Sequence, residues 1–206
     1  YTTLDDLFEQ VEFFVDSVSR YQSDFVLFPE YFNAPLMARF NNEGESQAIR
    51  GLAGYTDDIR ERFVGLAIKY NINIITGSMP YIREDGLLYN VGFLCRRDGS
   101  YEMYEKLHVT PDEMKCWGLS GGKAIRTFET DCARIGVLIC YDVEFPELSR
   151  IMADEGMQIL FAGSGLRPGA RHRERMLRGH CGQRGQPAAG PQHGYPVCAV
   201  GGLHAV

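Results

Sequence analysis

Three residues that could act together in nucleophilic catalysis each stand where an apolar run ends. Glu30 closes FVLFPE, Lys106 closes YEMYEK and Cys140 closes IGVLIC. Strand ends are where α/β folds place their sites, so a carboxylate, an amine and a thiol at such positions form a candidate catalytic set. Taken singly, each has an ordinary structural role, as a cap, a surface charge or a buried thiol. The functional interpretation depends on the three contexts together.

The chemistry of this set is that of an activated thiol. A cysteine has a pKa of about 8.5 and is a weak nucleophile until it loses its proton. Glu30 is flanked by aromatic residues and a proline, and loss of hydration there would make it a better base. Lys106 could offset that buried charge. Lys106 and the backbone N–H of Tyr141, which follows Cys140, could both donate to the oxyanion of a tetrahedral intermediate.

Helices are expected where apolar residues recur at helical spacing next to cap residues. Thr3 and Asp6 suit the N-terminal cap of an amphipathic helix that reaches about Ser19. A second helix is expected over residues 57–70, capped by Thr56, and a third over 146–155.

Apolar runs bounded by turn residues predict the strands. They lie at 25–30, 71–80 (ending at Pro80), 87–96, 101–107, 124–130, 134–142 and 157–164. The runs 87–96 and 101–107 flank an Asp-Gly turn and predict a β-hairpin. Helices alternating with such strands predict an α/β or α+β layered domain, with a sheet buried under helices.

The composition changes at about Gly165. Residues 166–206 contain six arginines, a single acid (Glu174), and neither phenylalanine nor isoleucine. We therefore divide the chain into a folded domain at 1–165 and an atypical Gly/Arg/Pro/His-rich tail at 166–206. The tail could be a disordered segment that binds nucleic acid, a metal-binding segment, or an out-of-frame translation of a GC-rich gene. We favour the last, because such frames overproduce Arg, Gly, Pro and Ala.

The bulk properties exclude several classes. The net charge of −6 argues against a general nucleic-acid binder, and no apolar run is long enough to cross a membrane. The start, YTTLDDLFEQ, lacks the features of a signal peptide, and the six cysteines form no C-x-x-C pair. We expect reduced thiols and a cytoplasmic location. The first residue is not Met, so we expect a fragment or a processed product.

At three places the sequence resembles the nitrilase superfamily, the carbon–nitrogen hydrolases. FPEYF is similar to the family's glutamate motif, EKLHVTPDE to its lysine motif and GVLICYDVEFPELSR to its cysteine motif, in the family's order. The resemblance covers about residues 1–165. It implies an α-β-β-α sandwich, commonly dimerised, and a partial domain here. The family's first strand and its C-terminal third are not recognised in this sequence.

The resemblance also implies roles for individual residues. Glu30 would be the general base, Lys106 the oxyanion stabiliser and Cys140 the nucleophile. Glu113 would be the second glutamate that positions the substrate and Lys106. The implied reaction attacks a small-molecule amide or nitrile, forms a thioester, releases ammonia or an amine, and ends in hydrolysis. It implies no metal and no organic cofactor, and a homo-oligomer if the C-terminal part were intact.

We expect an amide rather than a nitrile as substrate, and acyl transfer to an amine remains an alternative. Many members of the family have Arg at the position of Glu144. A Glu here resembles the subgroup whose hydrolase domain is fused to an acetyltransferase domain. A catalytically inactive truncated protein or an interaction fragment is a further alternative.

Two rival sites are weaker. Gly118-Leu-Ser120-Gly-Gly122 matches G-x-S-x-G, but a nucleophile elbow needs a strand before it and a helix after it. Here a loop is expected before it and a strand after it, so a Gly-rich turn is the better interpretation. The second is a metal site in the tail with the ligands Cys181, His180, His172 and His193. Their spacing fits no standard zinc site.

Overall fold

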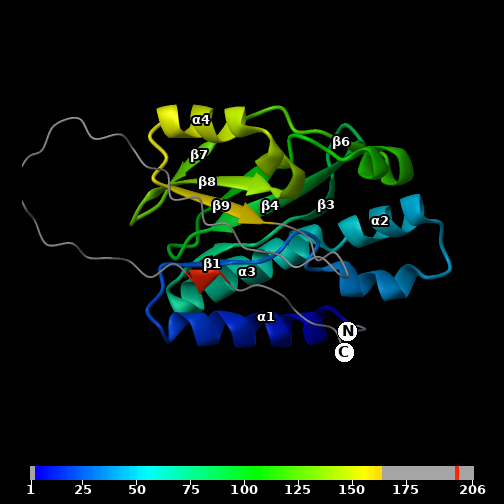
Figure 1. The fold of residues 1–206 in the computed structure, drawn as a ribbon. Coiled ribbons are helices and arrows are strands. Elements are labelled where there is room, and N and C mark those ends of the chain that lie inside the picture. The colour runs from blue at the N-terminus through cyan, green and yellow to red at the C-terminus, as the bar shows by residue number, and fades with distance from the viewer. Residues whose placement is uncertain (1–2, 164–197, 200–206) are drawn as a thin grey trace, which may run out of the picture.

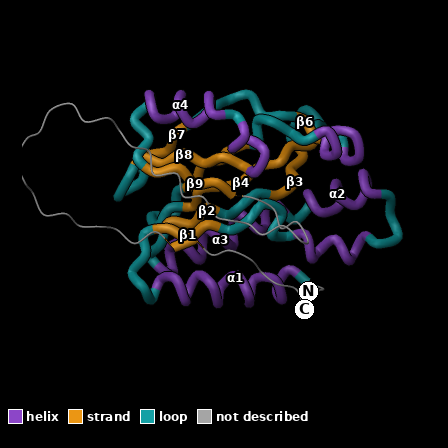
Figure 2. The backbone as a smooth tube through the Cα atoms, viewed as in Figure 1, coloured by secondary structure: helices purple, strands orange, loops and turns teal. Residues whose placement is uncertain are grey.

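The computed structural model describes residues 3–163 and 198–199, which form two packed sheets covered by helices. The layers run in the order helix, sheet, sheet, helix (Figures 1 and 2). Helix α4 (Pro146–Asp154) covers the smaller sheet, while α1 (Leu4–Ser19) and α3 (Thr56–Tyr70) cover the larger one. The expected α-β-β-α sandwich is therefore confirmed for this part of the chain.

The larger sheet runs in the order β10-β1-β2-β4-β3, and β5 and β6 also pair with β4. β1 and β2 are parallel, whereas β4 runs antiparallel to β2, β3 and β5. The pairing of β4 with β5 confirms the expected hairpin. The strands are β1 (Phe25–Leu27), β2 (Asn73–Ile75), β3 (Met79–Ile82), β4 (Leu88–Cys95), β5 (Tyr101–Glu105), β6 (Leu119–Ser120) and β10 (Cys198–Ala199).

The smaller sheet has the order β7-β8-β9, made of β7 (Thr127–Glu129), β8 (Arg134–Ile139) and β9 (Ile159–Gly163). β8 and β9 are parallel and are joined through α4. β8 is buried along most of its length because α4 lies on one of its faces and the larger sheet on the other.

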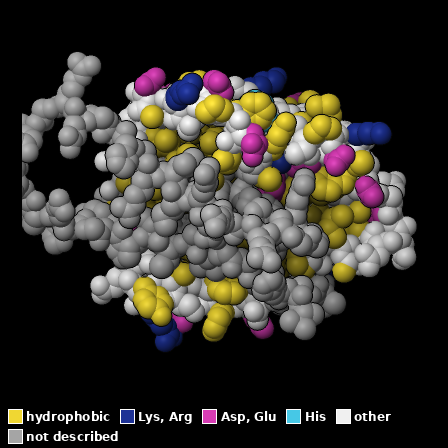
Figure 3. Space-filling view, in the orientation of Figure 1, with side chains coloured by type: hydrophobic (Ala, Val, Ile, Leu, Met, Phe, Trp, Pro, Cys, Tyr) yellow, Lys and Arg dark blue, Asp and Glu magenta, His cyan; other side chains and the backbone are white. Residues whose placement is uncertain are grey.

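Three apolar clusters hold the layers together. The first, between the larger sheet and its helices, centres on Phe63, whose ring lies 5.1–5.4 Å from those of Phe8, Phe28 and Phe32. The second joins the two sheets, and in it Phe25 of β1 meets Phe161 of β9 at 5.2 Å. The third lies between β8 and α4. On the outer surface, hydrophobic side chains lie among charged groups of both signs (Figure 3).

Several boundaries differ from the sequence expectations. The run 71–80 is not one strand, because Gly77 adopts a left-handed backbone (φ 73°) that separates β2 from β3. The strand also does not stop at Pro80. β3 pairs with β4 alone, and an edge strand tolerates a residue that cannot donate. Thr56 is not the cap of α3, since it is the first helical residue and donates from its hydroxyl to the Pro80 carbonyl at 2.6 Å.

Some elements agree with their local signals and others were not predicted. α1 begins with the expected capping box, in which Thr3 and Asp6 each accept from the other's backbone N–H. Not predicted were α2 (Glu45–Ala53) and the short helical turns η1 (Ala34–Phe40), η2 (Glu113–Trp117) and η3 (Cys140–Glu144). Within the described residues, no helix is both long enough and apolar enough to span a membrane.

Candidate active site

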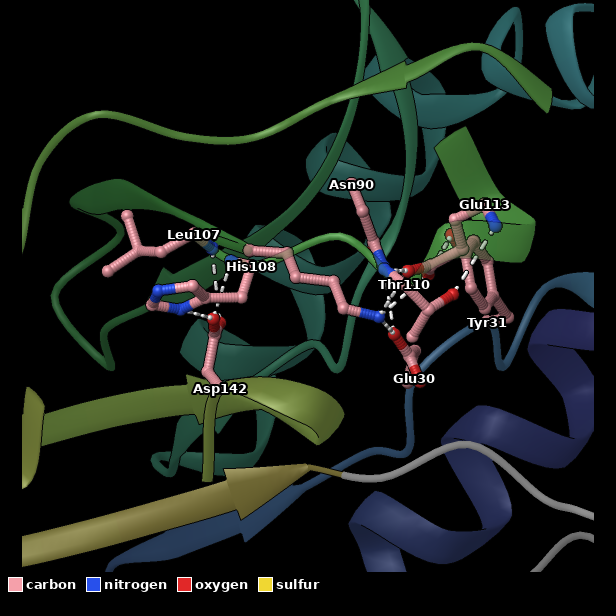
Figure 4. Close-up of polar contacts among 9 residues, drawn as sticks. Glu30, Tyr31, Asn90, Leu107, His108, Thr110, Glu113 and Asp142 are labelled. Atoms are coloured by element: carbon pink, nitrogen blue, oxygen red, sulfur yellow. Dashed lines mark hydrogen bonds and ion pairs between the residues drawn. The ribbon is translucent and has the colours of Figure 1, made fainter. Parts of the chain in front are cut away.

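Lys106 lies between two carboxylates at the end of β5. Its Nζ is 2.8 Å from Oε1 of Glu30, and 2.7 and 2.8 Å from the two carboxylate oxygens of Glu113. All three side chains are buried, with 1%, 5% and 7% of the Lys106, Glu30 and Glu113 side chains exposed. The structure therefore brings together three of the residues that the sequence nominated (Figure 4).

The larger sheet fixes Glu30 and Lys106 relative to one another through β4. Asn90 of β4 accepts the Lys106 backbone N–H at 2.9 Å and donates from its side chain to Oε1 of Glu30 at 2.9 Å. Glu30 itself forms a parallel bridge with Ser78. The chain approaches Glu30 closely at Gly77, where a Cβ would lie 2.1 Å from the carbonyl oxygen of the residue before Glu30.

Glu113 is the first residue of η2, and several donors outside η2 bind its carboxylate at once. The Thr110 backbone N–H donates to it at 2.7 Å and the Tyr31 hydroxyl at 3.1 Å, in addition to Lys106. The pKa of Tyr31 is raised above its usual range by burial and by the charges of Glu113 and Glu30. Tyr31 therefore keeps its proton at neutral pH and remains a donor to Glu113.

Burial and charge act in opposite directions on Lys106. Burial would lower the pKa of its ammonium group, but the charge of Glu30 and the hydrogen bonds to Glu113 and Glu30 outweigh it. The net result is a pKa above the ordinary 10.5. Lys106 is therefore a fixed cation over the physiological pH range, and it can face a developing oxyanion.

Cys140 stands where β8 meets η3, with a backbone that few cysteines adopt. Its φ is 47°, and Tyr31, next to Glu30, has φ 53°. A left-handed backbone costs a residue with a side chain about 1–2 kcal/mol, so the surrounding structure must hold both residues in place. A negative charge on Cys140 is the smallest of the causes that raise the pKa of Tyr31, after burial and the charges of Glu113 and Glu30. Tyr141 is the second residue of η3.

Two groups near these residues were not singled out from the sequence. Asn90 lies within LYNVGFL, which carries no sign of a site role. The pairing of β4 with β5 brings Lys106 to its backbone carbonyl, and its side chain reaches Glu30. Asp142 follows Cys140 by two residues and is fully buried. It accepts the backbone N–H groups of the two residues after Lys106. The acid close behind Cys140 was the one signal that could have identified it.

The serine alternative does not have the required surroundings. Ser120 lies in β6, and the helical turn η2 comes before it, so the strand–turn–helix order of a nucleophile elbow is absent there. Among the described residues no group of three or more His, Cys, Asp or Glu could hold a metal ion. The four metal ligands proposed for the tail lie outside the described residues, as do most of residues 166–206.

Known proteins are similar to this chain in sequence and in fold. The probable hydrolase YhcX of Bacillus subtilis (strain 168) is 46% identical over 159 residues, which cover 77% of this chain and 31% of that protein. The human omega-amidase NIT2 is 32% identical over 178 residues, covering 80% of this chain and 60% of that protein. The crystal structure of an amidase from Nesterenkonia sp. superposes with a TM-score of 0.67 at 22% identity.

That superposition covers 82% of this chain and 62% of the amidase, so the chain spans less than two thirds of the length of each of these relatives. The family model for carbon-nitrogen hydrolases matches residues 1–193, which is most of the sequence. The chain belongs to the carbon–nitrogen hydrolase family, as its resemblance to the nitrilase superfamily predicted.

Proposed function

We propose that this chain hydrolyses a small-molecule amide through a thioester on Cys140. The observation that carries the proposal is the buried Lys106 ammonium group, held at hydrogen-bond distance between Glu30 and Glu113. An ammonium group with two carboxylates leaves the cluster with an excess negative charge. One of the carboxylates can therefore act as a base while the other balances Lys106.

We assign the proton transfers to Glu30 and a positioning role to Glu113. Glu113 accepts from Lys106, from the Tyr31 hydroxyl and from the Thr110 backbone, so its oxygens are occupied by donors. Glu30 accepts from Lys106 and Asn90. A carboxylate held by an ammonium group, a phenol and a backbone N–H suits orientation, and the resemblance of FPEYF to the family's glutamate motif favours Glu30 as the base.

The first half of the reaction forms the thioester. Glu30 takes the proton of the Cys140 thiol, and the thiolate attacks the carbonyl carbon of the amide. The negative charge moves to the carbonyl oxygen, which the Lys106 ammonium group and the backbone N–H of Tyr141 stabilise. Glu30 then gives its proton to the nitrogen, the C–N bond breaks, and ammonia or an amine leaves.

The second half restores the thiol with water as the only co-substrate. Glu30 takes a proton from a water molecule, whose oxygen attacks the thioester carbon while Lys106 again faces the oxyanion. The C–S bond breaks, the carboxylic acid leaves, and Glu30 returns the proton that it took from water to the Cys140 thiolate. Amides are preferred to nitriles as substrates because the 32% identical relative is named an omega-amidase.

Selective alkylation tests whether the site is assembled. We expect iodoacetamide to modify Cys140 much faster than Cys95, because burial raises the pKa of Cys95 to about 12 and keeps it a thiol at neutral pH. Cys132, whose pKa is also raised by burial, should react slowly as well. Equal rates, measured by peptide mass spectrometry, would count against the proposal.

Turnover is the second test. Release of ammonia should be measured with aliphatic amides, ω-amides of oxo acids and nitriles, and Cys140→Ala should abolish it. A Cys140→Ala protein with unchanged amidase activity would overturn the mechanism, and a preference for nitriles would overturn the substrate assignment.

A further inference from the structure

A buried carboxylate connects the turn after Cys140 to the strand end that carries Lys106. The Asp142 side chain is only 1% exposed. Its Oδ2 accepts the backbone N–H of Leu107 at 3.1 Å, and its Oδ1 accepts the backbone N–H of His108 at 2.7 Å. The His108 ring nitrogen Nδ1 also lies 3.0 Å from Oδ1. We call this set of contacts, made by Asp142 with Leu107 and His108, the Asp142 clamp.

The clamp spans the two sheets next to the proposed reacting groups. Leu107 directly follows Lys106, whose backbone N–H pairs with β4 of the larger sheet. Asp142 lies two residues after Cys140, in η3 at the end of β8 of the smaller sheet. Figure 4 shows Asp142 pointing at Leu107 and His108, to one side of the group formed by Glu30, Glu113 and Tyr31.

The contacts that form the clamp have little freedom. Two of its donors are backbone N–H groups, which cannot rotate away as side-chain donors can, and a carboxylate removed from water needs such donors. The His108 ring is stacked on Phe145 with centroids 3.6 Å apart and planes at 11°. Phe145 in turn donates its backbone N–H to the Asp142 carbonyl at 3.1 Å. The clamp is therefore supported from both sheets.

We propose that Asp142 is a positioning residue that sets the distance between the Cys140 thiol and the Lys106 ammonium group. The proposal rests on the function proposed above, because it takes the roles of those two residues from it. Lys106 is fixed within the larger sheet by Glu30, Glu113 and Asn90, whereas Cys140 is delivered by the smaller sheet with a left-handed backbone. Without a polar contact across the sheets at this end, only apolar packing would determine their separation.

Two isosteric exchanges in the full chain test the proposal. Asp142→Asn replaces one acceptor oxygen by an NH₂ group. The amide then has a single acceptor oxygen, and one of the two backbone N–H groups loses its partner. The matched control is Asn73→Asp. Asn73 is also fully buried, and from the start of β2 it donates to Asp131 at 2.9 Å, between β7 and β8. That contact also joins the two sheets, at the end away from Glu30.

We expect both variants to lower the thermal midpoint, but only Asp142→Asn to affect the chemistry. Its kcat for an amide should fall about ten- to a hundred-fold, with KM changed by less than about three-fold. Its rate of Cys140 alkylation by iodoacetamide should fall several-fold. Asn73→Asp, assayed at a temperature where it is folded, should retain both rates. Folded Asp142→Asn protein with wild-type kcat and alkylation rate would overturn the proposal.

A second variant decides the question if Asp142→Asn does not fold. His108→Phe keeps the ring stacked on Phe145 and keeps the backbone N–H, but it removes the ring contact with Asp142. We expect a smaller but measurable slowing of Cys140 alkylation, and an unchanged rate would overturn the proposal.

The two proposals fail in different ways. A wild-type chain that releases no ammonia from any amide, while its Cys140 alkylation still depends on Asp142, would overturn the function and leave the clamp. An active wild-type chain whose kcat and Cys140 alkylation rate are unchanged by Asp142→Asn and by His108→Phe would overturn the clamp and leave the function.

Discussion

At Lys106 a single ammonium group is shared by two buried carboxylates, and this makes it important for stability as well as for the proposed chemistry. Removing one member of a buried ion pair leaves an uncompensated charge away from water. The Lys106 ammonium group contacts both Glu30 and Glu113, so its loss would leave two carboxylates without their shared cation.

We expect Lys106→Met to lower the free energy of unfolding by about 3–5 kcal/mol and kcat by about 10²–10³-fold. The double variant Lys106→Met/Glu113→Gln should recover part of the stability, because one of the stranded charges is gone, but none of the activity. Urea unfolding and ammonia release measure the two effects. A double variant less stable than Lys106→Met would contradict the charge explanation.

The raised pKa of Lys106 also gives a pH prediction. A group whose pKa is higher in the folded than in the unfolded state contributes its full stabilisation below the unfolded value, and loses it as the pH rises through the folded value. For Lys106 the unfolded value is about 10.5 and the folded value is higher. The stability difference between wild type and Lys106→Met should therefore stay constant from pH 7 to about pH 10. A rise in that difference beginning between pH 7 and 9 would mean that Lys106 loses its proton in the folded protein below its unfolded value, and it would contradict the raised pKa.

At the scale of elements, the turn between β2 and β3 determines where Glu30 lies. Gly77 combines a left-handed backbone with close contact to the chain that leads into Glu30, and its own carbonyl accepts the Tyr104 hydroxyl at 2.5 Å. In the run NINIITGSMP this glycine and Ser78 interrupt the apolar residues only briefly, which is why a single strand was predicted. Close approach between segments far apart in the sequence leaves no periodic signal.

We expect Gly77→Ala to destabilise the protein more than Gly86→Ala and to reduce activity. Both glycines have positive φ (73° and 75°), so both changes incur the left-handed backbone cost of about 1 kcal/mol or more. Only at Gly77 would the new Cβ also collide with backbone, since nothing lies within 4 Å of it at Gly86. Thermal unfolding and kcat of the two variants make the comparison, and equal losses would contradict it.

The short elements show where sequence patterns stop being informative. α1, α4 and the β4–β5 hairpin follow from caps, periodicity and an Asp-Gly turn, all of which are local. η2 has no such signal, although it begins with Glu113, which accepts hydrogen bonds from Thr110 and Tyr31 outside η2. Motif resemblance identified Glu113, but the turn around it and the donors to it come from tertiary packing.

At the scale of the whole molecule, the candidate site draws on both sheets. Glu30, Lys106 and Glu113 belong to the larger sheet and its loops, and Cys140 and Asp142 to the smaller one. Each strand end could be predicted from its own sequence. The Asp142 clamp could not, because it exists only when the sheets are packed face to face in one register. The tail at 166–206 stays a prediction, except that Cys198–Ala199 pair with β1.

Packing between the sheets should therefore affect activity more than equally strong packing elsewhere. Phe161→Ala removes a ring that contacts Phe25 across the sheets, and Phe8→Ala removes one that contacts Phe63 below the larger sheet. Both rings are buried, and each loss should cost about 3–5 kcal/mol. At a temperature where both variants remain folded, we expect kcat to fall further in Phe161→Ala. Similar kcat values would show that the inter-sheet core does not position the site.

The connection between the sheets has a practical consequence for building a two-part enzyme. The residues of the larger sheet that carry Glu30, Lys106 and Glu113 all precede exposed Lys123 and Ala124, and Cys140 and Asp142 come after them. A chain divided between Lys123 and Ala124 would carry the thiol on one fragment and its proposed base and oxyanion donor on the other. Each fragment alone should be silent, and rapid Cys140 alkylation should return only when the fragments reassociate, so that the pair would report proximity between two fused proteins.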